Sequence, residues 1–161
     1  MDKKRVKKFI YEGLGFPVVL VDVSLVKKRD IWTPAIDYNK LQRAVLLALT
    51  QKPASLSGYE IHFIRTYFEM TLEHFGKHFS VTHVAVLAWE KTGDRPAKMN
   101  PTTELCIRLF ILEKLNMNNQ VFREAFREFN IQGMTKAPSL KARKPITLPG
   151  TRVAKRSHAC T

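Results

Sequence analysis

The segment TLEHFGKHFSVTHVAVLAWE, from Thr71 to Glu90, carries the clearest structural pattern in the sequence. It contains two short helical patterns, one beginning after Thr71 and the other after Thr82. Threonine suits both positions because its hydroxyl accepts a hydrogen bond from a free backbone amide in the first helical turn. Two short helices joined by a tight turn are typical of a helix-turn-helix unit, which we therefore predict here.

The residues between the two caps fit this interpretation. Gly76 is expected where the two helices cross closely, because a larger side chain would push them apart. Ser80 stands where the turn often has a glycine, and Trp89 is expected to pack the helix after Thr82 against the helix that begins after Ser57. The small core between the helices is expected to hold Phe75, Phe79, Val81 and Val86.

A longer stretch, LSGYEIHFIRTYFEMTLEHFGKHFSVTHVAVLAWEKTGDRP from Leu56 to Pro96, resembles the XRE/Cro-type class of helix-turn-helix DNA-binding domains. Its end, AWEKTGDRP, is similar to the RWExGxxxP ending usual in that class, and the resemblance continues to about Leu115. It implies that the third helix of the domain, Thr82–Lys91, enters the major groove of double-stranded DNA.

Carried over position by position, the resemblance implies a set of DNA-contacting residues. Only Thr82 and His83 among them can hydrogen-bond a base edge, whereas the apolar members can touch thymine methyl groups. The same apolar helix face could instead bind a protein, in which case the unit serves as an interaction adaptor. The implied set is Thr71, Leu72, Thr82, His83, Val84, Leu87, Ala88 and Lys91.

A β-rich segment before such a domain also resembles the MqsA-type antitoxins and regulators. Those proteins carry an N-terminal zinc site built from cysteines, whereas the first cysteine here is Cys106. This resemblance implies an autoregulating antitoxin with a toxin as its protein partner. We expect a homodimer, because one short helix reads few base pairs and two-fold symmetry doubles the site.

The net charge of +13 indicates a polyanionic partner, with nucleic acid as the first candidate. Residues 1–57 carry +6 and residues 116–161 carry +7, while residues 58–115 are neutral overall. KKRVKK near the N-terminus therefore predicts a basic arm, and residues 136–161 predict a basic disordered tail. These flanks could also make the protein a non-specific nucleic-acid binder, or serve only solubility.

The rest of the sequence predicts a mostly α protein, an XRE-like helical bundle with a small N-terminal β-hairpin or sheet. Residues 9–33 are β-like, and Asp37 is expected to cap the next helix. Ser57 with Glu60 fits a capping box. The expected organisation is a hairpin plus helix over 1–53, the helix-turn-helix domain over 54–131 and the basic tail over 132–161.

Two further helices are predicted after the helix-turn-helix unit. Pro101 opens the first, in which Leu105, Leu109 and Leu112 form an apolar stripe. Residues 118–129 form a second amphipathic pattern.

Several classes of site and location are not expected. The sequence contains no nucleophile–base–orienter set and no phosphate-binding glycine loop, so we predict neither an enzyme nor a cofactor. His74 and His78 are four residues apart but lack a third ligand, so a metal site is not predicted. Cys106 is expected to be a small buried side chain. With only two cysteines and no apolar run of about 18 residues, the expected location is the cytoplasm, without a membrane partner.

Overall fold

The computed structural model describes residues 2–116 and 146–149. Helix takes 45% and strand 25% of this part of the chain, so the prediction of a mostly α protein was wrong. The described strands are β1 Lys3–Tyr11, β2 Val18–Lys28, β3 Ile31–Pro34 and β4 Ile146–Pro149. The described helices are α1 Tyr38–Gln51, α2 Gly58–Tyr67, α3 Leu72–His78, α4 His83–Glu90 and α5 Pro101–Lys114.

The sheet is mixed and is organised around β2. On one side β2 pairs along its length with β1, antiparallel, from Lys3↔Val26 to Tyr11↔Val18. On its other side the C-terminal half pairs antiparallel with β3, and the N-terminal half pairs parallel with β4. Two expected features change as a result: residues 3–8 are part of a strand and not a free arm, and residues 146–149 of the expected disordered tail form β4.

Asp22 divides β2 into two halves that bury alternate positions. Before it, Val18 and Leu20 are buried, and after it Val23 and Leu25 are buried. Asp22 has a φ of 54°, a conformation that aspartate adopts more readily than most residues. The alternation of buried and exposed residues therefore shifts by one position at Asp22, and the buried side chains of both halves join the same core.

The predicted helix starts are confirmed, because capping depends on residues close together in the sequence. Asp37 Oδ1 accepts hydrogen bonds from the amides of Asn39 (3.0 Å) and Lys40 (3.2 Å). Ser57 and Glu60 form the reciprocal capping box at the start of α2. Pro101 lies in the first turn of α5.

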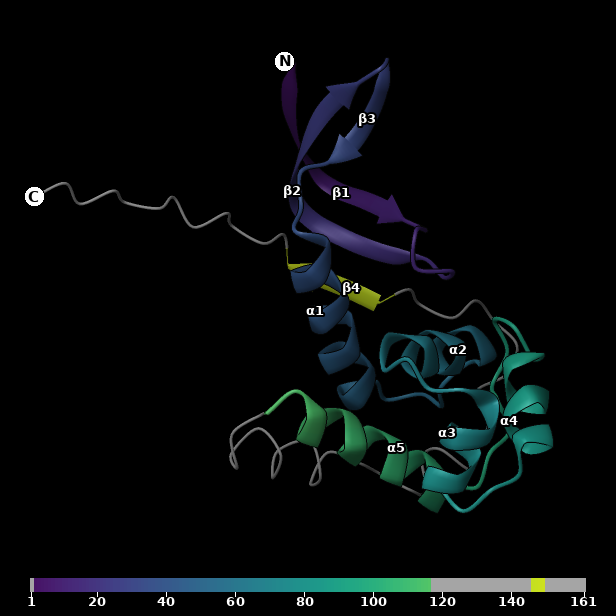
Figure 1. Cartoon of the computed structure of the whole chain (residues 1–161). Helices are drawn as coiled ribbons and strands as arrows, with labels where there is room; N and C mark the ends of the chain where they lie inside the picture. The colour runs from purple at the N-terminus through teal and green to yellow at the C-terminus, as the bar shows by residue number, and fades with distance from the viewer. Residues whose placement is uncertain (1, 117–145, 150–161) are drawn as a thin grey trace, which may run out of the picture.

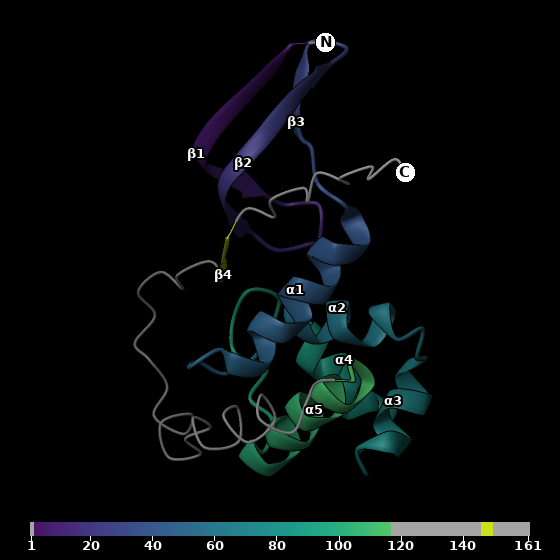
Figure 2. The same ribbon diagram turned by 90° about the vertical axis from the view of Figure 1, so that its left-hand side faces the viewer.

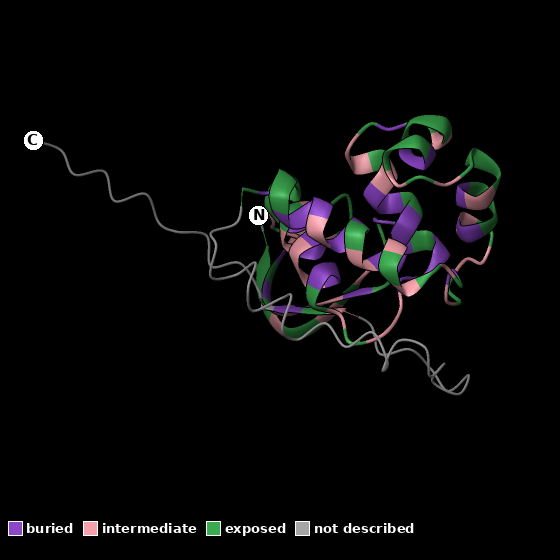
Figure 3. Ribbon diagram, turned by 90° about the horizontal axis from the view of Figure 1, so that it is seen from below, coloured by how far each residue is buried: buried purple, intermediate pink, exposed green. Residues whose placement is uncertain are grey.

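The sheet and the helices share one hydrophobic core. The sheet occupies one end of the molecule, and helices α2 to α5 gather at the other, with α1 leading from one to the other (Figures 1 and 2). Buried and exposed residues alternate along the helices, which is the pattern of one inward face per helix (Figure 3). Phe16, which precedes β2, packs edge-to-face on Phe63 of α2, with ring centroids 5.5 Å apart.

The buried face of α5 differs from the predicted leucine stripe. Leu112 is buried, but Leu105 and Leu109 are only partly so, and Glu104 and Arg108 are fully within the protein. Arg108 Nη2 donates to Glu104 Oε1 at 2.8 Å, and its guanidinium also donates to backbone carbonyls. The carbonyl acceptors are those of Leu49, Thr50, Lys52 and Ala54, in and after the last turn of α1.

Candidate nucleic-acid interface

Helices α3 and α4 form the predicted helix-turn-helix arrangement, with a very close crossing at Gly76. A Cβ atom added to Gly76 would lie 2.7 Å from the carbonyl oxygen of Val81 and 3.2 Å from the amide nitrogen of His83. Only glycine fits there without moving the turn. Ser80 occupies the left-handed region with a φ of 57°, which explains why a glycine is common at this position.

Both threonines of the motif are helix caps. Thr71 Oγ1 accepts a hydrogen bond from the amide of His74, and Thr82 Oγ1 accepts one from the amide of Ala85, each at 3.1 Å. Each hydroxyl still has its proton to donate. Thr82 can therefore cap α4 and contact a base or phosphate at the same time.

The inner face of α4 is held by both apolar and ionic contacts. Val86 is completely buried, and Trp89 is 9% exposed. At the end of α4, Glu90 Oε1 accepts from Arg65 Nε of α2 at 2.6 Å, and Glu90 Oε2 lies 2.9 Å from Nδ1 of His62. Burial raises the pKa of the Glu90 carboxyl, but the hydrogen bonds from Arg65 and His62 outweigh it, so the pKa lies below its ordinary value.

The outer face of α4 is exposed and mostly apolar. Val84 is 60% exposed and Leu87 is 36% exposed, so neither belongs to the core. Leu72 differs from the rest of the predicted set because it is half-buried and packs against the core. The exposed members of that set are Thr71, Thr82, His83, Val84, Leu87, Ala88 and Lys91.

The charge around this face is mixed. Glu73 in the first turn of α3 pairs with Lys77 at 3.0 Å. The hydrogen bond and charge of Lys77, with a smaller contribution from His83, hold the pKa of Glu73 below its ordinary value. Lys91 and Arg95 are exposed cations near the end of α4. The helix-turn-helix unit thus supplies shape and an outward helix, but little excess positive charge for phosphates.

The residues of the predicted basic arm lie on strand β1 of the sheet. Five basic residues of the expected arm are exposed on β1, and the partly buried Val6, Phe9 and Tyr11 fix that strand against the core. Phe9 and Tyr11 are two residues apart, as on one face of a strand, but Val6 is out of step with them and lysine is depleted in strands, so the local pattern did not predict the start of β1. The basic residues are Lys3, Lys4, Arg5, Lys7 and Lys8.

Other candidates take simple places in the fold. His74 is exposed, and His78 packs its ring against Phe79 and Phe110. Cys106 is exposed, so the expectation that it is buried was wrong; it lies on the side of α5 away from the core.

Metal-ligand groups and membrane-spanning helices are both absent from the described part of the chain, and some predicted features lie outside it. Within residues 2–116 and 146–149, no three His, Cys, Asp or Glu side chains are grouped so as to hold a metal ion. No helix in that part of the chain is long and apolar enough to cross a membrane. The amphipathic segment at 118–129, Cys160 and most of the predicted tail lie outside the described residues.

Comparisons with protein-family models, with curated proteins and with solved structures find no match to this chain. Any assignment of function therefore depends on the geometry of α3 and α4 and on the charges around them.

Proposed function

We propose that the protein is a sequence-specific DNA-binding transcriptional regulator that inserts α4 into the major groove of double-stranded DNA. The observation that carries this proposal is the contrast between the two faces of α4. Val86, Trp89 and Glu90 anchor its inner face, while the outer face from Thr82 onward is exposed. An α-helix held rigidly and exposed along one side is the element that fits the major groove.

The outer residues support a particular kind of base recognition. Thr82 and His83 lie at the start of α4, where recognition helices make most of their base contacts. Val84, Leu87 and Ala88 offer methyl groups to thymine. We therefore propose operators that present thymine methyl groups opposite this face, bound by a homodimer on a two-fold symmetric site. An autoregulating antitoxin that binds a toxin is the narrower form of the same proposal.

The experiment that tests the proposal is selection of bound sequences from random duplex DNA at about 0.15 M salt, where non-specific binding is weak. A palindromic consensus is the expected result, and its half-site spacing would report the dimer geometry. The absence of any consensus, with binding that disappears as salt rises, would contradict it.

Substitutions on α4 then test which residues read the consensus. His83→Ala is expected to lower specific affinity about fivefold or more, since one base contact contributes roughly 1–3 kcal/mol of discrimination. Thr82→Asp keeps a good N-cap but puts a negative charge at the groove, so it should weaken binding to every duplex. Thr102→Ala, at an exposed position of α5, is the matched control and should bind as the unchanged protein does.

A second candidate function is a protein-interaction adaptor. The exposure of Val84 and Leu87 favours it, because apolar side chains exposed together can mark a protein-binding surface. Val84→Ser with Leu87→Ser separates the two functions in combination with the selection experiment. If the protein regulates through DNA, this variant should change the selected consensus; if it is an adaptor, no consensus should exist to change.

A further inference from the structure

The strand β1 carries an unusual density of positive charge on an open sheet edge. Five of the six residues from position 3 to position 8 are basic, and all five are exposed. Among the described strands, β1 pairs only with β2, so its other edge is unpaired. We call this set the cationic strand; it consists of Lys3, Lys4, Arg5, Lys7 and Lys8.

Neighbouring groups leave most of this charge unneutralised. Lys4 is positioned over the ring of Trp32, 4.2 Å from the centroid. The other four basic residues form no ion pair with a carboxylate of the described chain. Lys3, Arg5 and Lys8 pair across the sheet with Val26, Ser24 and Val21, which carry no charge to offset them.

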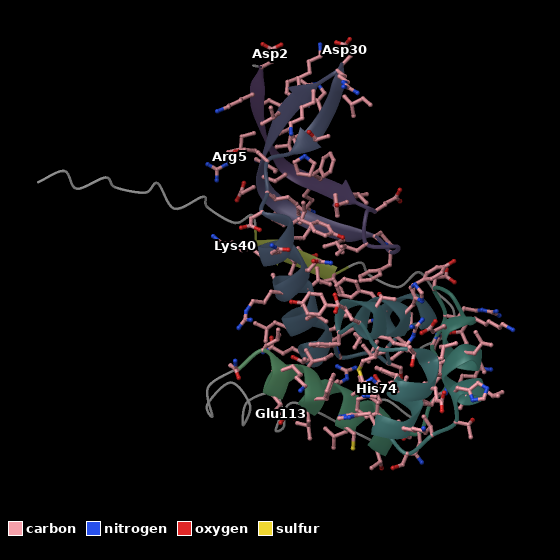
Figure 4. The ribbon with its side chains drawn as sticks, in the orientation of Figure 1. Asp2, Arg5, Asp30, Lys40, His74 and Glu113 are labelled. Atoms are coloured by element: carbon pink, nitrogen blue, oxygen red, sulfur yellow. The ribbon has the colours of Figure 1, made fainter. Side chains whose placement is uncertain are left out.

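The cationic strand and α4 lie on different sides of the molecule. The sheet is at the top of Figure 1 and α4 is at the lower right, and the sheet again lies above α4 after a turn of 90° (Figure 2). Arg5 projects to the left in Figure 4, on the same side as Lys40 at the start of α1. A straight duplex lying along α4 would therefore leave this charged side free.

The number of basic residues on β1 favours binding of a polyanion over the other role of lysine on edge strands, which is to prevent pairing with another sheet. Charged side chains on an edge strand also discourage edge-to-edge pairing of sheets. A strand rises about 3.4 Å per residue, so the cationic strand spans about 17 Å. A duplex of that length carries roughly ten phosphate charges, one for each 1.7 Å of its axis. With Lys4 held over Trp32, four free cations of the described chain remain over this distance, and they match a phosphate backbone better than they match one protective contact.

We propose that the cationic strand binds the phosphate backbone of a second duplex without regard to sequence, so that the protein bridges two DNA segments. This inference rests on the proposed function, because α4 supplies the first contact. Residues 58–115, which include α4, carry no net charge, so they add little non-specific attraction to DNA. In this proposal α4 reads the sequence of one duplex, and the cationic strand adds affinity for a neighbouring one.

Bridging is tested with the full chain and two duplexes. A duplex with the selected consensus is fixed to beads, protein is added, and capture of a second, labelled duplex of mixed sequence is measured at about 0.15 M salt. The test variant is Arg5→Thr with Lys8→Thr, since threonine suits a strand. The matched control, Lys98→Asn with Lys114→Gln, removes the same charge from two exposed positions outside the sheet, and asparagine tolerates the positive φ of Lys98.

The expected result is capture by the unchanged protein and the control, and about tenfold less capture by the test variant. Binding of the variant to the immobilised consensus should stay within about twofold of the unchanged protein. Capture that is equal in test and control variants would overturn the inference and leave the proposed function standing. An unchanged protein that binds the consensus but captures no second duplex would overturn it equally. Failure to bind any consensus would overturn the proposed function itself.

Discussion

Two positions near the α3–α4 turn favour glycine for different reasons, Gly76 because of space and Ser80 because of its backbone conformation. Gly76 has no room for a Cβ beside the carbonyl of Val81, so Gly76→Ala is expected to lower the free energy of unfolding by about 2 kcal/mol. Ser80 adopts a positive φ that glycine tolerates better, so Ser80→Gly should raise it by about 0.5 kcal/mol. Urea denaturation measures both. A neutral Gly76→Ala variant would show that the helices do not cross this closely.

The carboxyl of Glu90 makes stability depend on pH. Its pKa in the folded protein lies below the ordinary value of 4.5, so its contribution is fully present above that pH. The contribution is lost as pH falls through the lowered pKa. Glu90→Gln is therefore expected to cost about 1.5 kcal/mol near pH 7, and less in acid. Denaturation curves of both proteins across this range give the difference.

Glu73→Gln is the control for that experiment. Glu73 also has a lowered pKa, because it bonds Lys77, but both side chains of this pair are largely exposed. Exposed ion pairs contribute little to folding, so this variant should be nearly as stable as the unchanged protein at every pH. If the two variants behaved alike, the contacts of Glu90 with Arg65 and His62 would not be the cause.

Among the secondary-structure elements, the helix starts were predicted correctly, because each depends on residues close together in the sequence. The caps Asp37, Ser57, Thr71 and Thr82 and the helices that follow them are confirmed, because a cap and its partner amides are two or three residues apart. The outward residues of α4 were implied by the XRE/Cro resemblance, and Val84 and Leu87 are exposed as it implied.

The buried charges of α5 illustrate what could not be predicted. Glu104 and Arg108 have the spacing of an ordinary surface ion pair on a helix. Their burial depends on carbonyls 54 to 59 residues away, at the end of α1 and after it, and on the amide of Leu56. The residues of α5 alone do not indicate these distant partners. The sequence therefore predicted a buried leucine stripe, and it did not predict that Glu104 and Arg108 are buried.

Removing Arg108 tests the importance of this cluster. Arg108→Ala would leave the Glu104 carboxylate buried beside carbonyls that have lost their donor. The expected loss of unfolding free energy is about 3–5 kcal/mol, as for other buried pairs that lose one partner. Arg95→Ala, at an exposed position, should change it little. A similar small effect for both variants would mean that water replaces the guanidinium without cost.

For the molecule as a whole, the prediction of a mostly α protein was wrong because two strands of the sheet lack the usual composition of a strand. β1 is rich in lysine and β4 lies within a stretch rich in proline and basic residues, so neither has the composition of a strand. Both become strands because β2 offers them backbone partners and a core to cover. The segment before the helix-turn-helix unit and a segment near the other end of the chain thus complete a single sheet.

The contribution of β4 to that sheet can be measured at Leu148. This side chain is 7% exposed and belongs to the hydrophobic core, and its strand pairs with the buried Val18 and Leu20 of β2. Leu148→Ala is expected to lower the free energy of unfolding by about 2–3 kcal/mol through the cavity it creates. Thr147→Ala, at the exposed position beside it, is the control and should have a small effect. Equal stability of the two variants in urea would mean that the sheet is complete without β4, and that this end of the chain is free to act as the basic tail that its composition predicted.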